Sequence, residues 1–151
     1  MNDVDGHCLD DLEIGMSAYY SRTITDADVV NFAGVSGDTN PIHLDEEFAS
    51  STHFGTRIAH VMLYASYLYT VLGTKLPGPG SVYIDQRLRF TAPVKVGDTV
   101  VARATVRKID TKTARVALET TCKVKDRLVI DGEAILKVPR HKRRYSFNRR
   151  S

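Results

Sequence analysis

Apolar and polar residues alternate along most of the second half of the chain. Val, Ile, Thr and Ala are interleaved with charged residues over residues 81–90, 98–109, 113–125 and 128–138. Such an alternation, with a period of two, is typical of strands that bury one face. Turn-forming residues separate these segments at Pro93 and Gly97-Asp98, at Asp110-Thr111 and at Lys125-Asp126. The pattern therefore predicts an antiparallel meander.

The most apolar segment is predicted to be a helix from Ile58 to Leu72, ended by Gly73. It is apolar on nearly all sides, whereas a surface helix shows one apolar stripe, so we expect the rest of the fold to enclose it. Three shorter elements are predicted upstream: a strand over residues 17–24, a helix from the N-cap Thr25 to about Val35, and a helix over residues 45–50. Together these elements predict an α+β fold in which a curved antiparallel sheet wraps around a long central helix.

Length and composition fit a single globular domain. The chain has 151 residues, of which 42% are hydrophobic and 26% charged, as is usual for such domains. No apolar run reaches the ~20 residues that a membrane-spanning helix needs, and the acidic, polar N-terminus is unlike a secretory signal. Two cysteines, Cys8 in an N-terminal segment expected to be loose and Cys122 in a strand-like run, fit a reducing cytoplasm.

Positive charge is concentrated at the C-terminus. Residues 140–151 contain six Lys and Arg residues and no acid, and removing these six charges from the net charge of +3 leaves −3 for residues 1–139. We therefore expect one folded domain over residues 1–139 and a basic, disordered tail over residues 140–151. The interleaved Tyr145 and Phe147 keep nucleic-acid or membrane binding open, but no nucleic-acid-binding motif accompanies them.

The candidate chemistry lies in the segment Gly37-Asp38-Thr39-Asn40-Pro41-Ile42-His43. The residue before a proline is pushed out of the α region, and Asn-Pro marks a turn. We therefore expect a bent loop that brings Asp38 and His43 to the same side. A carboxylate and an imidazole held together are suited to the addition or removal of water, which requires proton transfer.

Plainer interpretations of these residues exist. Asp38 and Asn40 could form only the hydrogen bonds of a turn, and His43 could be a structural histidine. No Cys/His cluster has metal-ligand spacing, so we expect no metal. No Gly-rich dinucleotide fingerprint occurs, so no nicotinamide or flavin is expected, and no serine lies in a nucleophile-elbow context.

The segment from Phe32 to His43, with Ala49 beyond it, resembles the hydratase-2 motif of MaoC-like (R)-specific enoyl-CoA hydratases. Three further segments are similar to the family over their length: Ile58-Ala59-His60 followed by Met62-Leu63, residues 76–83 and residues 90–98. The likeness covers about residues 10–139. It implies a hot-dog fold, normally paired as a homodimer, and reversible hydration of a trans-2-enoyl-CoA to an (R)-3-hydroxyacyl-CoA.

The resemblance also implies site residues. Asp38 and His43 match the catalytic pair that positions and activates water, and Asn40 matches a residue that orders the loop near the pair and the substrate. Side chains of the central helix, here Tyr69 and Leu72, are implied to close the far end of the acyl pocket, where a bulky Tyr69 favours short acyl groups. No cofactor is implied, because coenzyme A is part of the substrate.

Val61 departs from the family pattern. The residue after His60 is usually glycine, and its backbone N–H donates to the thioester oxygen. Valine retains the N–H but adds a β-branched side chain where the thioester approaches closely, so it narrows the site, weakens activity or reflects an introduced substitution. Two alternatives to a hydratase stay open: a hot-dog acyl-CoA thioesterase, and an acyl-binding domain that is catalytically impaired by Val61.

Overall fold

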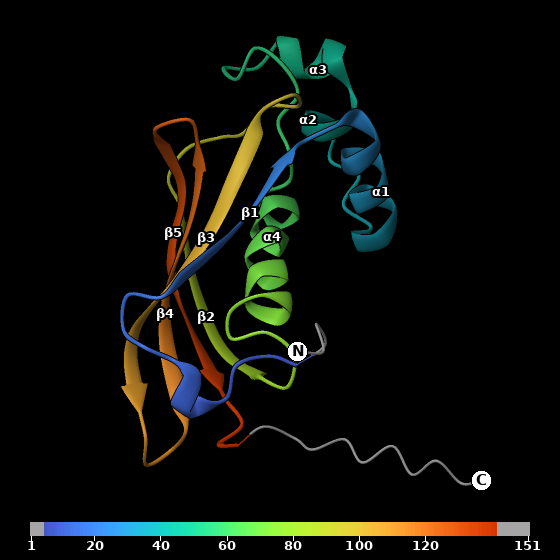
Figure 1. Cartoon of the computed structure of the whole chain (residues 1–151). Coiled ribbons are helices and arrows are strands. Elements are labelled where there is room, and N and C mark those ends of the chain that lie inside the picture. The colour runs from blue at the N-terminus through green and yellow to red at the C-terminus, as the bar shows by residue number, and fades with distance from the viewer. Residues whose placement is uncertain (1–4, 142–151) are drawn as a thin grey trace, which may run out of the picture.

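The computed structural model describes residues 5–141 and contains a curved five-stranded antiparallel sheet wrapped around one long helix (Figure 1). The strands are β1 (Ser17–Thr23), β2 (Val82–Phe90), β3 (Thr99–Asp110), β4 (Arg115–Val124) and β5 (Arg127–Lys137). The helices are the 3₁₀ helix η1 (Leu9–Asp11) and the α-helices α1 (Asp26–Ser36), α2 (Pro41–Leu44), α3 (Glu46–Ser50) and α4 (Val61–Thr74). This is the hot-dog arrangement, and the predicted fold class is confirmed.

The sheet order is β1-β3-β4-β5-β2, so only β3, β4 and β5 form the predicted meander. The prediction is wrong for β2, which pairs with β5 at one edge of the sheet instead of with β3. The backbone after β2 forms hydrogen bonds with other segments of the chain. Val94 O accepts a hydrogen bond from Ala59 N at 2.7 Å, and Gly97 N donates to Ile24 O at 2.8 Å. These contacts lead the chain past the start of α4 to the end of β1, beside which β3 begins.

Helix α4 packs against the inner face of the sheet (Figure 1). Tyr64, Leu68 and Leu72 on its inner side are inaccessible to solvent, which removes a large apolar area from water. On its other side Met62 is 53% and Tyr69 63% exposed. The expectation that the chain encloses this helix completely is therefore wrong, and α4 keeps an uncovered apolar strip.

The bounds of α4 differ slightly from the predicted ones. Ile58 forms an isolated bridge with Lys95, so the segment before Val61 is extended rather than helical. At its other end the helix continues through Gly73 to Thr74. Consequently His60 is the N-cap residue and Val61 contributes the first amide of the helix.

Helices α1, α2 and α3 lie together beside the N-terminal end of α4 (Figure 1). Thr25 is the N-cap of α1 as predicted, since its hydroxyl accepts from Asp28 N at 3.1 Å and the Asp28 carboxylate accepts from Thr25 N at 3.1 Å. The segment expected to be only a bent loop contains α2, a single helical turn. Pro41 is its first residue, where the fixed φ of proline suits a helix and no N–H is needed.

Both ends of the described chain are attached to the domain. Cys8 is buried instead of lying in a loose segment, because His7 N donates to Pro77 O and Leu9 N donates to Pro139 O, both at 2.8 Å. The guanidinium of Arg140 donates to two carbonyl oxygens of the β3–β4 turn. The rest of the predicted tail, residues 142–151, lies outside the described residues. Within residues 5–141, no helix has the length and apolar character required to cross a membrane.

Candidate active site

Asp38 is held in place by the two turns that lead from α1 into α2. Gly37 ends α1 in the left-handed conformation, with a φ of 78° that glycine adopts without strain. Asp38 Oδ1 then accepts a hydrogen bond from Asn40 N, and Asn40 Oδ1 accepts one from Ile42 N, both at 3.1 Å. Asp38 and Asn40 thus both form turn hydrogen bonds, and the second carboxylate oxygen of Asp38, Oδ2, lies toward His43.

His43 lies on α2 and is almost fully buried. Its Nδ1 atom is 2.7 Å from the carbonyl oxygen of Ile58. A carbonyl oxygen only accepts, so Nδ1 carries the hydrogen and Nε2 keeps its lone pair in the neutral ring. Burial lowers the pKa of His43 below its usual value, and nearby His60 lowers it further, against the raising effects of the Ile58 carbonyl and Asp38. The ring is therefore neutral at neutral pH, with Nε2 available as a base.

The two functional groups face each other across a short gap. Nε2 of His43 lies 3.9 Å from Oδ2 of Asp38, and the Asp38 side chain is 52% exposed. This distance is too long for a direct hydrogen bond, but a water molecule can lie about 2.8 Å from both atoms. Both atoms accept hydrogen bonds, so a water between them can donate one hydrogen to each. The gap between the two groups is therefore wide enough for one water molecule and is exposed to solvent on the Asp38 side.

Val61 supplies the first backbone N–H of α4 and directly follows His60, whose ring contacts both Asp38 and His43. The first amides of a helix have no carbonyl one turn earlier to bond, and the helix dipole adds positive potential there. Val61 is 37% exposed, so it is not a core residue. An uncommitted amide near an acid–base pair is a suitable donor for an oxygen that gains negative charge.

His60 contacts both members of the pair, which its position beside a predicted helix start does not distinguish from the packing of a core histidine. Its ring stacks on that of His43 with centroids 3.8 Å apart. Ligand atoms of Asp38, His43 and His60 lie within 4.8 Å of one another, a grouping that could suggest a metal. However, the two rings are only 27° from parallel. Lone pairs lie in the ring planes, so those of stacked rings point side by side instead of at one centre, and this geometry does not favour a shared ion.

A cavity of about 320 Å³ runs between α4 and the edge strand β2. Its lining is mostly apolar and aromatic: Met62, Ala65, Ser66, Tyr69, Tyr83, Gln86 and Leu88. Tyr69 forms part of this wall, with its ring centroid 5.3 Å from that of Tyr83. Leu72 is fully buried in the core and does not line the cavity, so the expected contact between Leu72 and a substrate is not supported. Packing of α4 against the sheet buries it, which helical spacing alone does not reveal.

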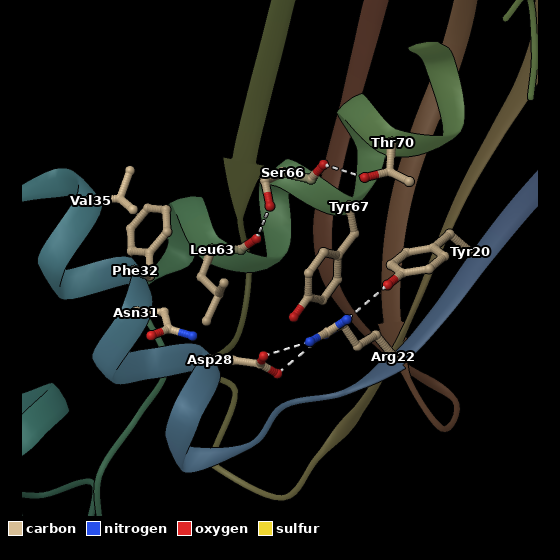
Figure 2. Close-up of a pocket in the computed structure, with 10 residues that line it drawn as sticks. All are labelled: Tyr20, Arg22, Asp28, Asn31, Phe32, Val35, Leu63, Ser66, Tyr67 and Thr70. Carbon is tan, nitrogen blue, oxygen red and sulfur yellow. Dashed lines mark hydrogen bonds and ion pairs between the residues drawn. The ribbon is translucent and has the colours of Figure 1, made fainter. Parts of the chain in front are cut away.

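A second cavity of about 350 Å³ lies between α1, α4 and β1 (Figure 2). Its polar side is formed by Arg22, which donates to both carboxylate oxygens of Asp28 at 2.6 and 3.2 Å. The Arg22 guanidinium lowers the pKa of Asp28 to about 2. Phe32 lines this cavity and also contacts the His60 ring at a centroid distance of 4.9 Å. Neither Asp38 nor His43 lines this cavity.

The fold and this site together define a hot-dog protein with an acid–base pair. Residues 12–127 match the family described as MaoC like domain. The chain is 50% identical over 131 residues to a 3-hydroxybutyryl-CoA dehydratase of Methylorubrum extorquens, covering 87% of this chain and 83% of that protein. It is 48% identical over 133 residues to an (R)-specific enoyl-CoA hydratase of Rhodospirillum rubrum, covering 88% of this chain and 92% of that protein.

Solved structures of similar proteins support the same family assignment. The unliganded R-hydratase PhaJ1 from Pseudomonas aeruginosa superposes with a TM-score of 0.88 at 40% identity, covering 93% of this chain and 90% of that one. The (R)-hydratase from A. caviae that is involved in PHA biosynthesis superposes with a TM-score of 0.83 at 41% identity, covering 85% and 98%. This chain therefore belongs to the MaoC-like family, as the sequence motifs indicated.

Proposed function

We propose that this protein is an (R)-specific enoyl-CoA hydratase, a hydro-lyase that reversibly hydrates trans-2-enoyl-CoA to (R)-3-hydroxyacyl-CoA. The observation that carries the proposal is the fixed gap of 3.9 Å between His43 Nε2 and Asp38 Oδ2, in a ring whose other nitrogen is committed to Ile58. The curated relatives named as hydratase and dehydratase support the same reaction.

In the proposed reaction, water is held between Asp38 and His43. One of the two groups takes a proton from the water as its oxygen bonds to the β-carbon, and the π electrons of the double bond move toward the thioester carbonyl. The Val61 amide stabilises the negative charge that develops on the carbonyl oxygen. The pair then returns the proton to the α-carbon, so the pair ends in its starting state. The reaction needs no cofactor, and coenzyme A takes part only as a portion of the substrate.

The cavity along α4 is the proposed site for the acyl chain. Met62, which directly follows Val61, lines the cavity, and the Tyr69–Tyr83 pair forms an aromatic wall. Its volume of about 320 Å³ lies near the low end of the range usual for small-molecule sites. This supports a preference for short acyl groups, as the bulk of Tyr69 suggested. Asn40 supports the site indirectly, because its side chain caps α2.

We propose that the protein acts as a homodimer. β2 is an edge strand with unpaired backbone groups, a feature that invites pairing with a second chain. Exposed apolar side chains gather on β2 and on the neighbouring face of α4: Met62, Tyr69, Val82, Ile84 and Phe90. Light scattering should give twice the chain mass of 16.8 kDa at micromolar concentration. A cytoplasmic location stays a prediction from the sequence.

One assay separates the proposed function from its alternatives. Purified protein is incubated with crotonyl-CoA while the conjugated enoyl absorbance and the free thiol are followed together. A hydratase removes the enoyl absorbance without releasing thiol, and chiral analysis of the product should give the (R)-alcohol. Thiol release instead indicates a thioesterase, and binding without either signal indicates the impaired acyl-binding domain. Either of these results contradicts the proposal.

A further inference from the structure

We propose that His60 is a positioning residue that fixes where Asp38 and His43 lie relative to the first amide of α4. This role rests on the hydratase function proposed above. His60 is only 2% exposed, so its polar ring is removed from water. It is also the N-cap residue of α4, and its side chain makes no capping hydrogen bond. The ring is therefore free of the usual N-cap role and makes three other contacts.

The first two contacts are with aromatic rings. One face of the His60 ring stacks on His43, with centroids 3.8 Å apart and planes 27° from parallel. Phe32 of α1 contacts it with centroids 4.9 Å apart. The hydrogen bond to Ile58 fixes one atom of the His43 ring, but it still permits tilting about that bond. The stacked His60 ring restricts this tilt and so restricts where Nε2 of His43 points.

The third contact reaches the other member of the pair. Nε2 of His60 lies 3.0 Å from the carbonyl oxygen of Asp38. Because a carbonyl only accepts, Nε2 carries the hydrogen and donates it. Nδ1 of His60 is buried without a hydrogen-bond partner. Within residues 5–141, the bond from Nε2 to Asp38 is therefore the one hydrogen bond that orients the His60 ring.

His60 also belongs to the segment that supplies the other parts of the site. Ile58 O fixes the His43 tautomer, Ala59 N is bonded to Val94 O of the neighbouring connection, and Val61 follows with the proposed oxyanion amide. A single segment of four residues therefore contacts both members of the acid–base pair and provides the amide. Without the His60 ring, Asp38 would be joined to this segment only through its own loop.

Other charged groups near His43 are already engaged. Arg57 donates through Nε to His43 O at 2.6 Å, and its guanidinium pairs with Asp26 at 2.6 Å. Glu46 accepts from Arg57 N at 3.2 Å. Asp38 is thus the only acid that lies within ion-pair distance of the His43 ring among residues 5–141. A change in His43 titration on substitution of His60 can therefore be assigned to the stacked ring.

Three substitutions separate the two contacts that His60 makes with the pair. His60→Phe keeps an aromatic ring against His43 and removes the donor to Asp38. His60→Gln keeps an amide donor and removes the ring, and His60→Ala removes both. We expect kcat for crotonyl-CoA to fall about 10- to 100-fold in His60→Ala, the scale of a small misplacement of reacting groups. KM should change less than kcat. The kcat of His60→Phe and that of His60→Gln should each lie between the kcat of His60→Ala and that of the parent.

The decisive readout is the titration of His43, measured by NMR of the imidazole signals in the free protein. We expect the pKa of His43 to rise in His60→Phe and His60→Ala, because a neighbouring imidazole that disfavours its protonation is removed. His53→Phe, at an exposed histidine outside the site, is the matched control and should change neither kcat nor this titration. Thermal unfolding of every variant shows whether it is folded.

The outcomes are distinct. Folded His60 variants with the parent kcat and an unchanged His43 titration would overturn the positioning role, as would a loss confined to thermal stability. If the parent itself does not hydrate crotonyl-CoA, the proposed function fails, while the titration still reports whether His60 controls the His43 ring.

Discussion

The Nδ1 atom of His43 lies 2.7 Å from the carbonyl oxygen of Ile58, fifteen residues further along the chain. This contact joins the loop that carries the acid–base pair to the segment that starts α4. It also decides which nitrogen of the ring is free, since the hydrogen must be on Nδ1. The free Nε2 faces Asp38, so two residues that are close in sequence also face each other in the fold.

Asp38→Asn and His43→Ala should each lower hydratase turnover by about 10²-fold or more, the usual scale for a positioned acid or base. In Asp38→Asn the amide oxygen can still accept from Asn40 N, so the turn should be kept. Turnover of crotonyl-CoA is measured alongside thermal unfolding. Glu47→Gln, a change to an exposed acid of α3, is the control for loss of one negative charge. A folded variant that hydrates at the parent rate would remove that residue from the mechanism.

Activity should depend on pH through His43. Its lone pair at Nε2 is needed, and protonation of the ring removes it. Because burial lowers the pKa of His43, the kcat/KM for hydration should hold down to a pH below the usual value of 6.5 and then fall. The same lowered pKa means that the unfolded chain binds this proton more readily, so stability is also lost as pH falls from 6.5 through the folded-state pKa. A midpoint at or above 6.5 would contradict this account.

The sequence predicted the fold well because its strongest signals are local. Alternation identifies β3, β4 and β5, and turn residues between them allow only hairpins. Alternation does not identify the neighbour of a strand, so β2 was placed beside β3 when it lies beside β5. Its position depends on backbone bonds of the connecting segment with residues far away in sequence.

The same distinction applies to the site. Asp38 and His43 lie five residues apart, so the Asn-Pro turn was enough to predict that they meet. His60 is distant from both in sequence, and its contacts arise only when α4 is placed against α1 and α2. The prediction that Cys8 lies in a loose segment is wrong for a similar reason. Backbone hydrogen bonds to Pro77 and Pro139, both far away in sequence, hold the residues on either side of Cys8. A histidine next to a helix start carried too little local signal to be separated from a packing residue.

Thr25→Ala should destabilise the protein by about 1 kcal/mol, the usual cost of losing an N-cap side chain. The hydroxyl accepts from Asp28 N, and alanine leaves that donor without its partner. Urea unfolding measures the change in the free energy of unfolding. Thr25→Ser keeps the hydroxyl and should stay close to the parent. Equal losses in both variants would show that the methyl group, and not the cap, stabilises α1.

Tyr69→Ala should shift the substrate preference toward longer acyl chains. The Tyr69 ring forms part of the cavity wall with Tyr83, and its removal lengthens the apolar space along α4. The measurement is the ratio of kcat/KM for an eight-carbon enoyl-CoA to that for crotonyl-CoA. Tyr19→Ala, at an exposed tyrosine on the opposite edge strand β1, is the control. An unchanged ratio in Tyr69→Ala would place the acyl chain elsewhere.

Val61→Gly should raise hydratase activity. Val61 is 37% exposed and is the first residue of α4. In the proposed mechanism its side chain would narrow the approach of the thioester to the oxyanion amide. Glycine removes this obstacle and keeps the N–H donor. A misplaced donor of this kind can cost about 10²–10³ in rate, so the gain is expected to be large if valine displaces the thioester oxygen.

The stability cost of Val61→Gly should be small. Glycine costs roughly 0.5–1 kcal/mol inside a helix, but position 61 begins the helix and its side chain is not part of the core. Val61→Ala is the matched control, since it removes most of the bulk without the added backbone freedom. The test compares kcat/KM for crotonyl-CoA and for a longer enoyl-CoA in all three proteins. A graded rise from valine through alanine to glycine supports steric narrowing at the amide, whereas equal values for both substrates would show that Val61 neither blocks the site nor shapes substrate choice.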